Sequence, residues 1–97
     1  MQYSFEWDPQ KEKLNQSKHK ISFERAAQVF LDPFALSLYD EAHSTDDERW
    51  LTLGKDSNNV LLVVVHTFRE IDESRSSIRV ISARKATKKE TRHYSAR

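Results

Sequence analysis

The stretch VLLVVVHTF, residues 60–68, decides the fold. Its apolar side chains would fall on both faces of an extended chain, which is typical of a strand in the centre of a sheet. Arg69 follows directly, and alternation places it on the same face as Leu61 and Val63. We therefore expect a central strand that ends at a cationic residue.

Period-two patterns on either side of this stretch predict its neighbours in the sheet. Further strands are expected over 35–41, 48–53 and 78–83. The segment GKDSNN, residues 54–59, predicts a hairpin because Gly54 and the paired asparagines tolerate positive φ. REIDESRSS, residues 69–77, predicts an exposed loop.

The N-terminal third predicts one strand and two helices. Aromatic and polar residues alternate in YSFEW, residues 3–7, as in a half-buried strand. Asp8 can cap a helix that starts at Pro9 and runs to about Ser17, with Leu14 as its one clear core residue.

Ser22 can cap the second helix, which Asp32-Pro33 ends. Its apolar residues have amphipathic spacing: Phe23, Ala26, Ala27 and Phe30.

The C-terminal segment predicts a third helix. Thr87 and Glu90 have the spacing of a capping box, so this helix should begin at Lys88. The expected order is strand, two helices, four strands and one helix. This order predicts an α+β fold, an antiparallel sheet with helices packed against it, in one domain over residues 1–97.

Composition excludes several classes of protein. No cysteine is present, so neither a disulfide nor a thiolate site is available. The longest apolar run is Val60–Val65, far below the ~20 residues of a membrane-spanning helix. The N-terminus lacks the pattern of a signal peptide, so we expect a cytoplasmic protein with no membrane partner.

Charge is distributed unevenly along the chain. Residues 32–56 carry seven acids and two bases, a net charge of −5, whereas residues 75–97 carry eight bases and one acid, a net charge of +7. The basic end is suited to a polyanion and the acidic segment to a basic partner.

Lys88 and Lys89 would lie in the first turn of the last helix, where the helix dipole already places positive charge. Together with Arg84 and Lys85 they could form a phosphate site, or they could be a solvated basic face. Arg69 and Arg84 could flank one phosphate, although antiparallel pairing would place the two strand ends at opposite edges. The pattern leaves both questions open.

Histidines and acids give weaker signals. No two of the four histidines have zinc-ligand spacing, and no cofactor is expected; they are His19, His43, His66 and His93. His19, between two lysines, could be a neutral general base or a histidine bonded to a helix-terminal carbonyl. His66 is expected within or beside the core. DDE, residues 46–48, resembles a metal-nuclease cluster only weakly, because successive strand residues face opposite sides.

Five segments of the chain together resemble the BrnT family of ribonuclease toxins from bacterial type II toxin–antitoxin systems. They are FEWDPQK (5–11), NQSKHKISFERAAQVFLDP (15–33), HSTDDERWLTLG (43–54), LLVVVHTFRE (61–70) and IRVISARKATKKETRHY (78–94). The resemblance implies a RelE-like fold and an endoribonuclease that inhibits translation. It also implies neutralisation by a BrnA-type antitoxin with a ribbon-helix-helix domain, which would bring the complex to operator DNA.

The resemblance further implies site residues. The catalytic set would be Lys18, His19, Arg69, Arg84, Glu90 and Tyr94, and Ser82 would contact the RNA. The basic residues expected from the charge pattern to bind RNA are Lys85, Lys88, Lys89 and Arg92. The two catalytic arginines would stabilise the transition state without a metal ion, His19 or Glu90 would take the 2′-hydroxyl proton, and Lys18 or Tyr94 would assist the leaving oxygen. The chain departs from the family at Lys20, usually glycine, and at His66, often tyrosine or apolar.

Two alternative functions remain open from the sequence. The same basic end, with Trp7, Trp50 and Tyr94 as stacking residues, could belong to a nucleic-acid-binding module without catalysis. The acidic segment could instead make the protein chiefly an antitoxin-binding partner.

Overall fold

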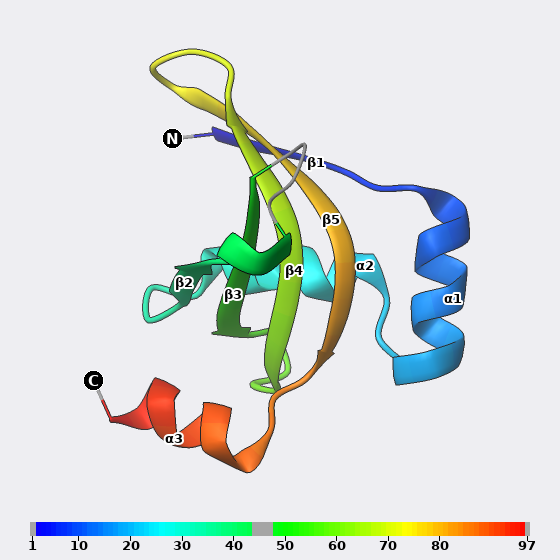
Figure 1. The fold of residues 1–97 in the computed structure, drawn as a ribbon, viewed down its shortest axis with the longest axis vertical. Helices are drawn as coiled ribbons and strands as arrows, with labels where there is room; N and C mark the ends of the chain where they lie inside the picture. The colour runs from blue at the N-terminus through cyan, green and yellow to red at the C-terminus, as the bar shows by residue number, and fades with distance from the viewer. Residues whose placement is uncertain (1, 44–47, 97) are drawn as a thin grey trace.

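Five strands form one sheet in the order β1-β5-β4-β3-β2 (Figure 1). The computed structural model describes residues 2–43 and 48–96. The strands are β1 (Gln2–Glu6), β2 (Leu36–Tyr39), β3 (Arg49–Lys55), β4 (Leu61–Glu70) and β5 (Arg75–Lys85). The α+β class and the order of elements are confirmed. One prediction is wrong in part, because β1 pairs with β5 in parallel while the other strand pairs are antiparallel.

Helices α1 (Pro9–His19) and α2 (Phe23–Gln28) follow β1, and the 3-10 turn η1 (Val29–Leu31) continues α2. A second 3-10 turn, η2 (Glu41–His43), follows β2, and α3 (Lys88–Ser95) ends the described chain. The predicted caps are present: the side chain of Asp8 accepts from the Gln10 amide and that of Ser22 from the Arg25 amide. α2 crosses one face of the sheet, and α3 lies at the end where β5 finishes (Figure 1).

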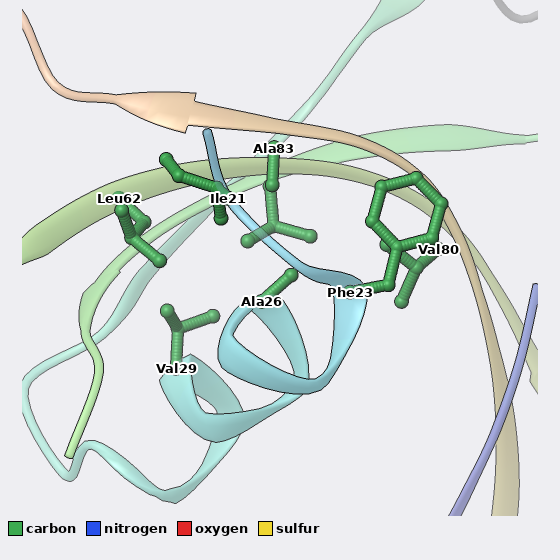
Figure 2. Packing of buried hydrophobic residues seen from close by; sticks show 8 residues of the cluster. Ile21, Phe23, Ala26, Val29, Leu62, Val80 and Ala83 are labelled. Carbon is green, nitrogen blue, oxygen red and sulfur yellow. The ribbon is translucent and has the colours of Figure 1, made fainter. Parts of the chain in front are cut away.

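The main core lies between α2 and the central strands (Figure 2). Ala27 and Phe30 of the predicted apolar set are only half-buried. Phe23 and Ala26 are fully buried as predicted, and so is Val29, which was not in that set. They pack on strand residues of the same face, namely Leu62, Val64, Val80 and Ala83, with Ile21 from the preceding turn. Burial of each large aliphatic side chain stabilises the fold by roughly 1.5–3 kcal/mol, so this cluster fixes the helix on the sheet.

Both hairpins differ in detail from the predictions. Asn59 has the positive φ expected of its turn, 66°, but Gly54 lies inside β3 rather than in the turn. A Cβ atom on Gly54 would stand 3.1 Å from the Cβ of Val29, so glycine allows η1 to approach the strand. The expected loop over 69–77 is too long, because β4 reaches Glu70 and β5 begins at Arg75.

Helix α1 is held by a polar residue instead of the predicted apolar one. Leu14 is 70% exposed, whereas Asn15 is buried. The Asn15 amide donates to the carbonyls of Ile21 and Ala83, both at 2.9 Å, and its oxygen accepts from the Ala83 amide at 3.1 Å. Because β1 pairs with β5 only as far as Arg79, Asn15 satisfies the strand edge beyond that point.

His66 is buried as predicted, with 3% of its surface exposed. Its Nδ1 lies 3.2 Å from the Thr67 carbonyl, which can only accept, so Nδ1 carries the proton. Nε2 then accepts from the Thr52 hydroxyl at 2.6 Å, and Thr52 accepts from Ser37 at 2.8 Å. Burial lowers the pKa of His66, which keeps the ring neutral inside this chain of hydrogen bonds.

Candidate functional site

Two different surfaces occupy the sheet face opposite α2. Over β2, β3 and β4 the face is apolar and forms a hollow of about 240 Å³ bordered by α3. Along β5 the same face carries polar and basic side chains, which are Ser77, Arg79, Ser82 and Arg84. We call this surface the β5 stripe. Its residue types are those that bind phosphate groups in proteins.

An irregularity in β5 creates the stripe. Arg79 and Arg84 are five residues apart, so strict alternation would put them on opposite faces. The pairing of β4 with β5 shifts between Val65 and His66: Val65 faces Ser82, whereas His66 faces Val80. One extra residue, Ile81, is thereby accommodated as a bulge, a device that redirects side chains. Sequence periodicity missed Arg79 because nothing in its pattern marks the bulge.

Arg84 is held by Glu90 at the start of α3. The guanidinium donates from Nη1 to Oε1 at 2.8 Å and from Nη2 to Oε2 at 2.9 Å, a bidentate pair. Oε1 of Glu90 also accepts from the Thr87 amide at 2.8 Å, and the Thr87 hydroxyl accepts from the Glu90 amide, which completes the predicted capping box. The bond from Arg84 is the main reason why the pKa of Glu90 falls to about 2.

The lysines of the last helix lie in the open. Lys85, Lys88, Lys89 and Arg92 are exposed, and none of them forms an ion pair within residues 2–43 and 48–96. The two helical lysines occupy the first turn, as predicted. The surface around the start of α3 is therefore cationic, with Arg84 as its one neutralised member.

Tyr94 fastens the other end of α3 to the body of the protein. Its hydroxyl donates to Asp32 Oδ2 at 2.6 Å, and the Lys55 amide donates to the same oxygen at 2.8 Å. Burial would raise the pKa of Asp32, but the bonds from Tyr94, Lys55 and Phe34 together lower it. The Lys55 ammonium lies 5.7 Å from the centre of the Tyr94 ring. Tyr94 thus has a structural function here.

Lys18 and His19 end α1. Lys18 is exposed and His19 is half-buried. Lys20 takes the left-handed conformation, φ 61°, and its amide donates to the Gln16 carbonyl at 2.9 Å. Lysine therefore forms the turn that glycine would favour, at some conformational cost. Because Asn15 contacts Ala83, His19 lies one helical turn further along the edge of β5.

The structure does not bring Arg69 and Arg84 together. In the β4–β5 register Arg84 faces Val63, whereas Arg69 faces Ser77. Six residues separate Val63 from Arg69, or about 20 Å of strand at ~3.3 Å per residue. The two arginines share a face of the sheet but lie near its opposite ends, so they cannot flank one phosphate.

Arg69 instead shares a cleft with Arg79. This cleft of about 350 Å³ lies on the face of the β5 stripe, towards the β4–β5 hairpin. Its lining residues are Glu6, Glu48, Thr67, Phe68, Arg69, Ser77 and Arg79. We call it the Arg69–Arg79 cleft. The sequence pattern had singled out Arg69 and, in the weakly favoured DDE segment, Glu48; strand register brings the other residues to them.

The tryptophans and the DDE segment are the remaining features that the sequence singled out. Trp7 packs edge-on against Phe23, and Trp50 against Tyr39, so both tryptophans have intramolecular partners. Asp46 and Asp47 of the DDE segment lie outside the described residues. Within the described ranges no three potential metal-ligating side chains gather, and no helix has the length and apolarity to cross a membrane.

Comparisons with known proteins find similarity of two kinds, to a family model and to a solved structure. Residues 7–90 match the family model described as the ribonuclease toxin BrnT of type II toxin–antitoxin systems. The fold is similar to the crystal structure of the Brucella abortus ribonuclease toxin BrnT, with a TM-score of 0.63 and 21% sequence identity over 91% of this chain and 100% of that chain. No curated protein sequence matches. Since the family model spans most of the sequence, the chain belongs to the BrnT family of ribonuclease toxins of type II toxin–antitoxin systems.

Proposed function

We propose that this ribonuclease toxin cuts RNA internally without a metal ion and so inhibits translation in the cytoplasm. A ribose 2′-hydroxyl attacks the adjacent phosphodiester, leaving a 2′,3′-cyclic phosphate and a 5′-hydroxyl. The observation that supports this most is the β5 stripe, which continues into the exposed lysines of α3. Fixed arginines can supply the positive charge that a phosphoryl transition state needs.

In this proposal the cationic surface around the start of α3 holds the RNA backbone. Lys85, Lys88, Lys89 and Arg92 contact phosphates, and Ser82 adds a hydroxyl donor. Arg84 binds at the same end, in an orientation set by Glu90. Roles in proton transfer for Lys18 and His19 stay predictions from the sequence.

One assay tests the function. Purified, antitoxin-free protein is incubated with end-labelled single-stranded RNA in excess chelator, and the product ends are analysed. We expect fragments with cyclic phosphate ends, and fewer of them from Arg84→Ala. Intact RNA that remains bound to the protein would refute catalysis and favour the alternative of a binding module, for which Arg84 and the lysines would suffice.

The partner in this proposal is a BrnA-like antitoxin with a ribbon-helix-helix domain, through which the complex reaches operator DNA. One apolar surface is suited to it: Leu31, Phe34, Leu38 and Tyr39 lie exposed at or near the outer strand β2. We call these residues the β2-edge patch. They lie within or beside the acidic segment 32–56, so a basic, amphipathic antitoxin segment would fit the charge.

A further inference from the structure

The Arg69–Arg79 cleft is lined by four charged side chains. They are Arg69, Arg79, Glu6 and Glu48. Among the residues that the structure describes, none of these four side chains forms a hydrogen bond or an ion pair. The other described arginines of the sheet differ, since Arg75 pairs with Asp72, Arg84 pairs with Glu90, and Arg49 also has an interaction.

Strand register fixes how these groups face one another. Glu6 is the parallel partner of Arg79, and Thr67 is the antiparallel partner of Arg79. Arg69 and Ser77 form the next row on the same face. The cleft therefore has two guanidinium groups and two hydroxyls on neighbouring strands, with Glu6 on the outer strand beside them.

Two guanidinium groups on rigid strands suit a phosphodiester, because each can donate two parallel hydrogen bonds to its oxygens. A simple phosphate-binding site would, however, be weakened by a carboxylate. The position of Glu6 beside Arg79 is explained if the cleft also needs a proton acceptor. A base within reach of a bound phosphate is what cleavage by a 2′-hydroxyl requires.

We infer that the Arg69–Arg79 cleft binds the scissile phosphodiester, with Arg69 and Arg79 on its non-bridging oxygens and Glu6 as the general base. This inference rests on the proposed ribonuclease activity. It places the chemistry away from His19, which lies on α1 at the edge of β5. Glu6 is preferred to Glu48 because it belongs to a strand and pairs with Arg79, whereas Glu48 lies outside β3.

Cleavage moves one proton to Glu6 and exchanges one bond at phosphorus. The 2′-hydroxyl proton passes to the Glu6 carboxylate while the 2′ oxygen forms a bond to phosphorus. The bond from phosphorus to the 5′ oxygen breaks, and that oxygen takes a proton from water. The arginines stabilise the charge that develops on the non-bridging oxygens, and Glu6 returns its proton to solvent.

The cationic surface around the start of α3 then binds another phosphate of the same RNA strand. Arg79 faces Thr67 and Arg84 faces Val63, four residues away on β4. This separation is about 13 Å at ~3.3 Å per residue, so the two sites contact different phosphates. The RNA lies along the β5 stripe between them.

Two variants with matched controls test the inference. Glu6→Gln is compared with Glu70→Gln, an exposed glutamate at the end of β4 outside the cleft. Arg79→Ala is compared with Arg75→Ala, which removes the same charge from the same strand. Cleavage of a labelled RNA is measured, and binding is measured with an oligonucleotide that carries a 2′-deoxyribose at the mapped cleavage position.

We expect Glu6→Gln to lower kcat by a factor of about 10²–10⁴. This variant should bind the uncleavable oligonucleotide as well as or better than the wild type, because a negative charge has left the site. Arg79→Ala should lower kcat by about 10²–10³ and also weaken binding. Arg79→Lys should recover only part of kcat, because lysine lacks the planar fork.

Wild-type rates for either Glu6→Gln or Arg79→Ala would overturn the inference while leaving the ribonuclease function intact. Losses no larger than those of the matched controls would do the same. Thermal unfolding of each variant must match the wild type, which the exposure of both residues leads us to expect. A wild-type protein that cleaves no RNA would overturn the proposed function together with this inference.

Discussion

Glu90 shows how a residue with a catalytic appearance can serve a structural purpose. Both of its oxygens accept from Arg84, and one also accepts from the Thr87 amide. A pKa of about 2 means that this carboxylate binds a proton weakly at neutral pH. Effective general bases have pKa values closer to the working pH. The position of Glu90 therefore favours orienting Arg84 over accepting a proton.

Glu90→Gln should destabilise the protein by about 1 kcal/mol at pH 7, because it removes part of a capping box and a partly exposed ion pair. The pKa of Glu90 falls from its ordinary value of 4.5 to about 2 on folding. The stabilisation is therefore complete above pH 4.5 and is lost as the pH falls towards 2.

Urea unfolding of wild type and Glu90→Gln over pH 7 to 3 measures this difference. The gap between the two free energies of unfolding should narrow as the pH falls. Thr91→Ala is a useful control, since Thr91 lies in the same turn and lacks a carboxylate. A gap that stays constant with pH would show that the ion pair contributes nothing.

At the scale of elements, the sequence predicted interactions between nearby residues but not the pairing of distant strands. Asp8, Ser22 and Thr87 marked three helix starts because a side-chain cap is a local interaction. The parallel pairing of β1 with β5 joins segments about 70 residues apart, and nothing near Tyr3 or Phe5 specifies it. The bulge at Ile81 was not predicted for the same reason, because it depends on how β4 pairs with β5.

Asn15 shows the same limit within a helix. Its neighbour Leu14 has the apolar character expected of a core residue, yet Leu14 points to solvent. The backbone of Ala83 at an unpaired strand edge needs a donor and an acceptor, and the Asn15 amide supplies both. A sequence pattern cannot show that need, because it arises only when β1 ends short of Ala83.

Asn15→Ala should lower the free energy of unfolding by about 2–4 kcal/mol, because three hydrogen bonds are lost and buried backbone groups are left unpaired. Chemical denaturation measures the change. Gln16→Ala, the exposed neighbour on α1, should change stability by less than about 0.5 kcal/mol. Equal effects from the two substitutions would mean that the Ala83 edge finds water instead.

At the scale of the whole molecule, the basic half of the charge asymmetry in the sequence corresponds to a basic surface of the fold. The basic C-terminal segment does supply both the β5 stripe and the open lysines of α3. Arg69 was correctly placed on a face of β4, but its companion Arg79 and the distance to Arg84 required the register of β4 with β5. Composition predicts a polyanion partner, whereas the position of a reacting group depends on the strand register.

Separate surfaces for RNA and antitoxin would let the two functions be altered independently. The β2-edge patch lies near the outer strand β2, whereas Glu6 and Arg79 lie on β1 and β5 at the other side of the sheet. Phe34 is 63% exposed, and it lines a hollow of about 500 Å³ together with Leu31 and Pro33. An apolar antitoxin side chain could fill this hollow, with basic neighbours near the acidic segment.

Phe34→Ala should therefore weaken antitoxin binding by a factor of about 10–30, the loss expected for a buried aromatic anchor of ~2 kcal/mol. Ile71→Ala is the matched control, because Ile71 is also an exposed apolar residue, 48% exposed, at the β4–β5 hairpin. Calorimetry with the cognate antitoxin gives the affinities, and the RNA assay should show unchanged cleavage by Phe34→Ala. Unchanged affinity for Phe34→Ala would place the antitoxin elsewhere. Reduced affinity with reduced cleavage would mean that the two surfaces overlap, and an antitoxin covering the β5 stripe would then inhibit by blocking RNA directly.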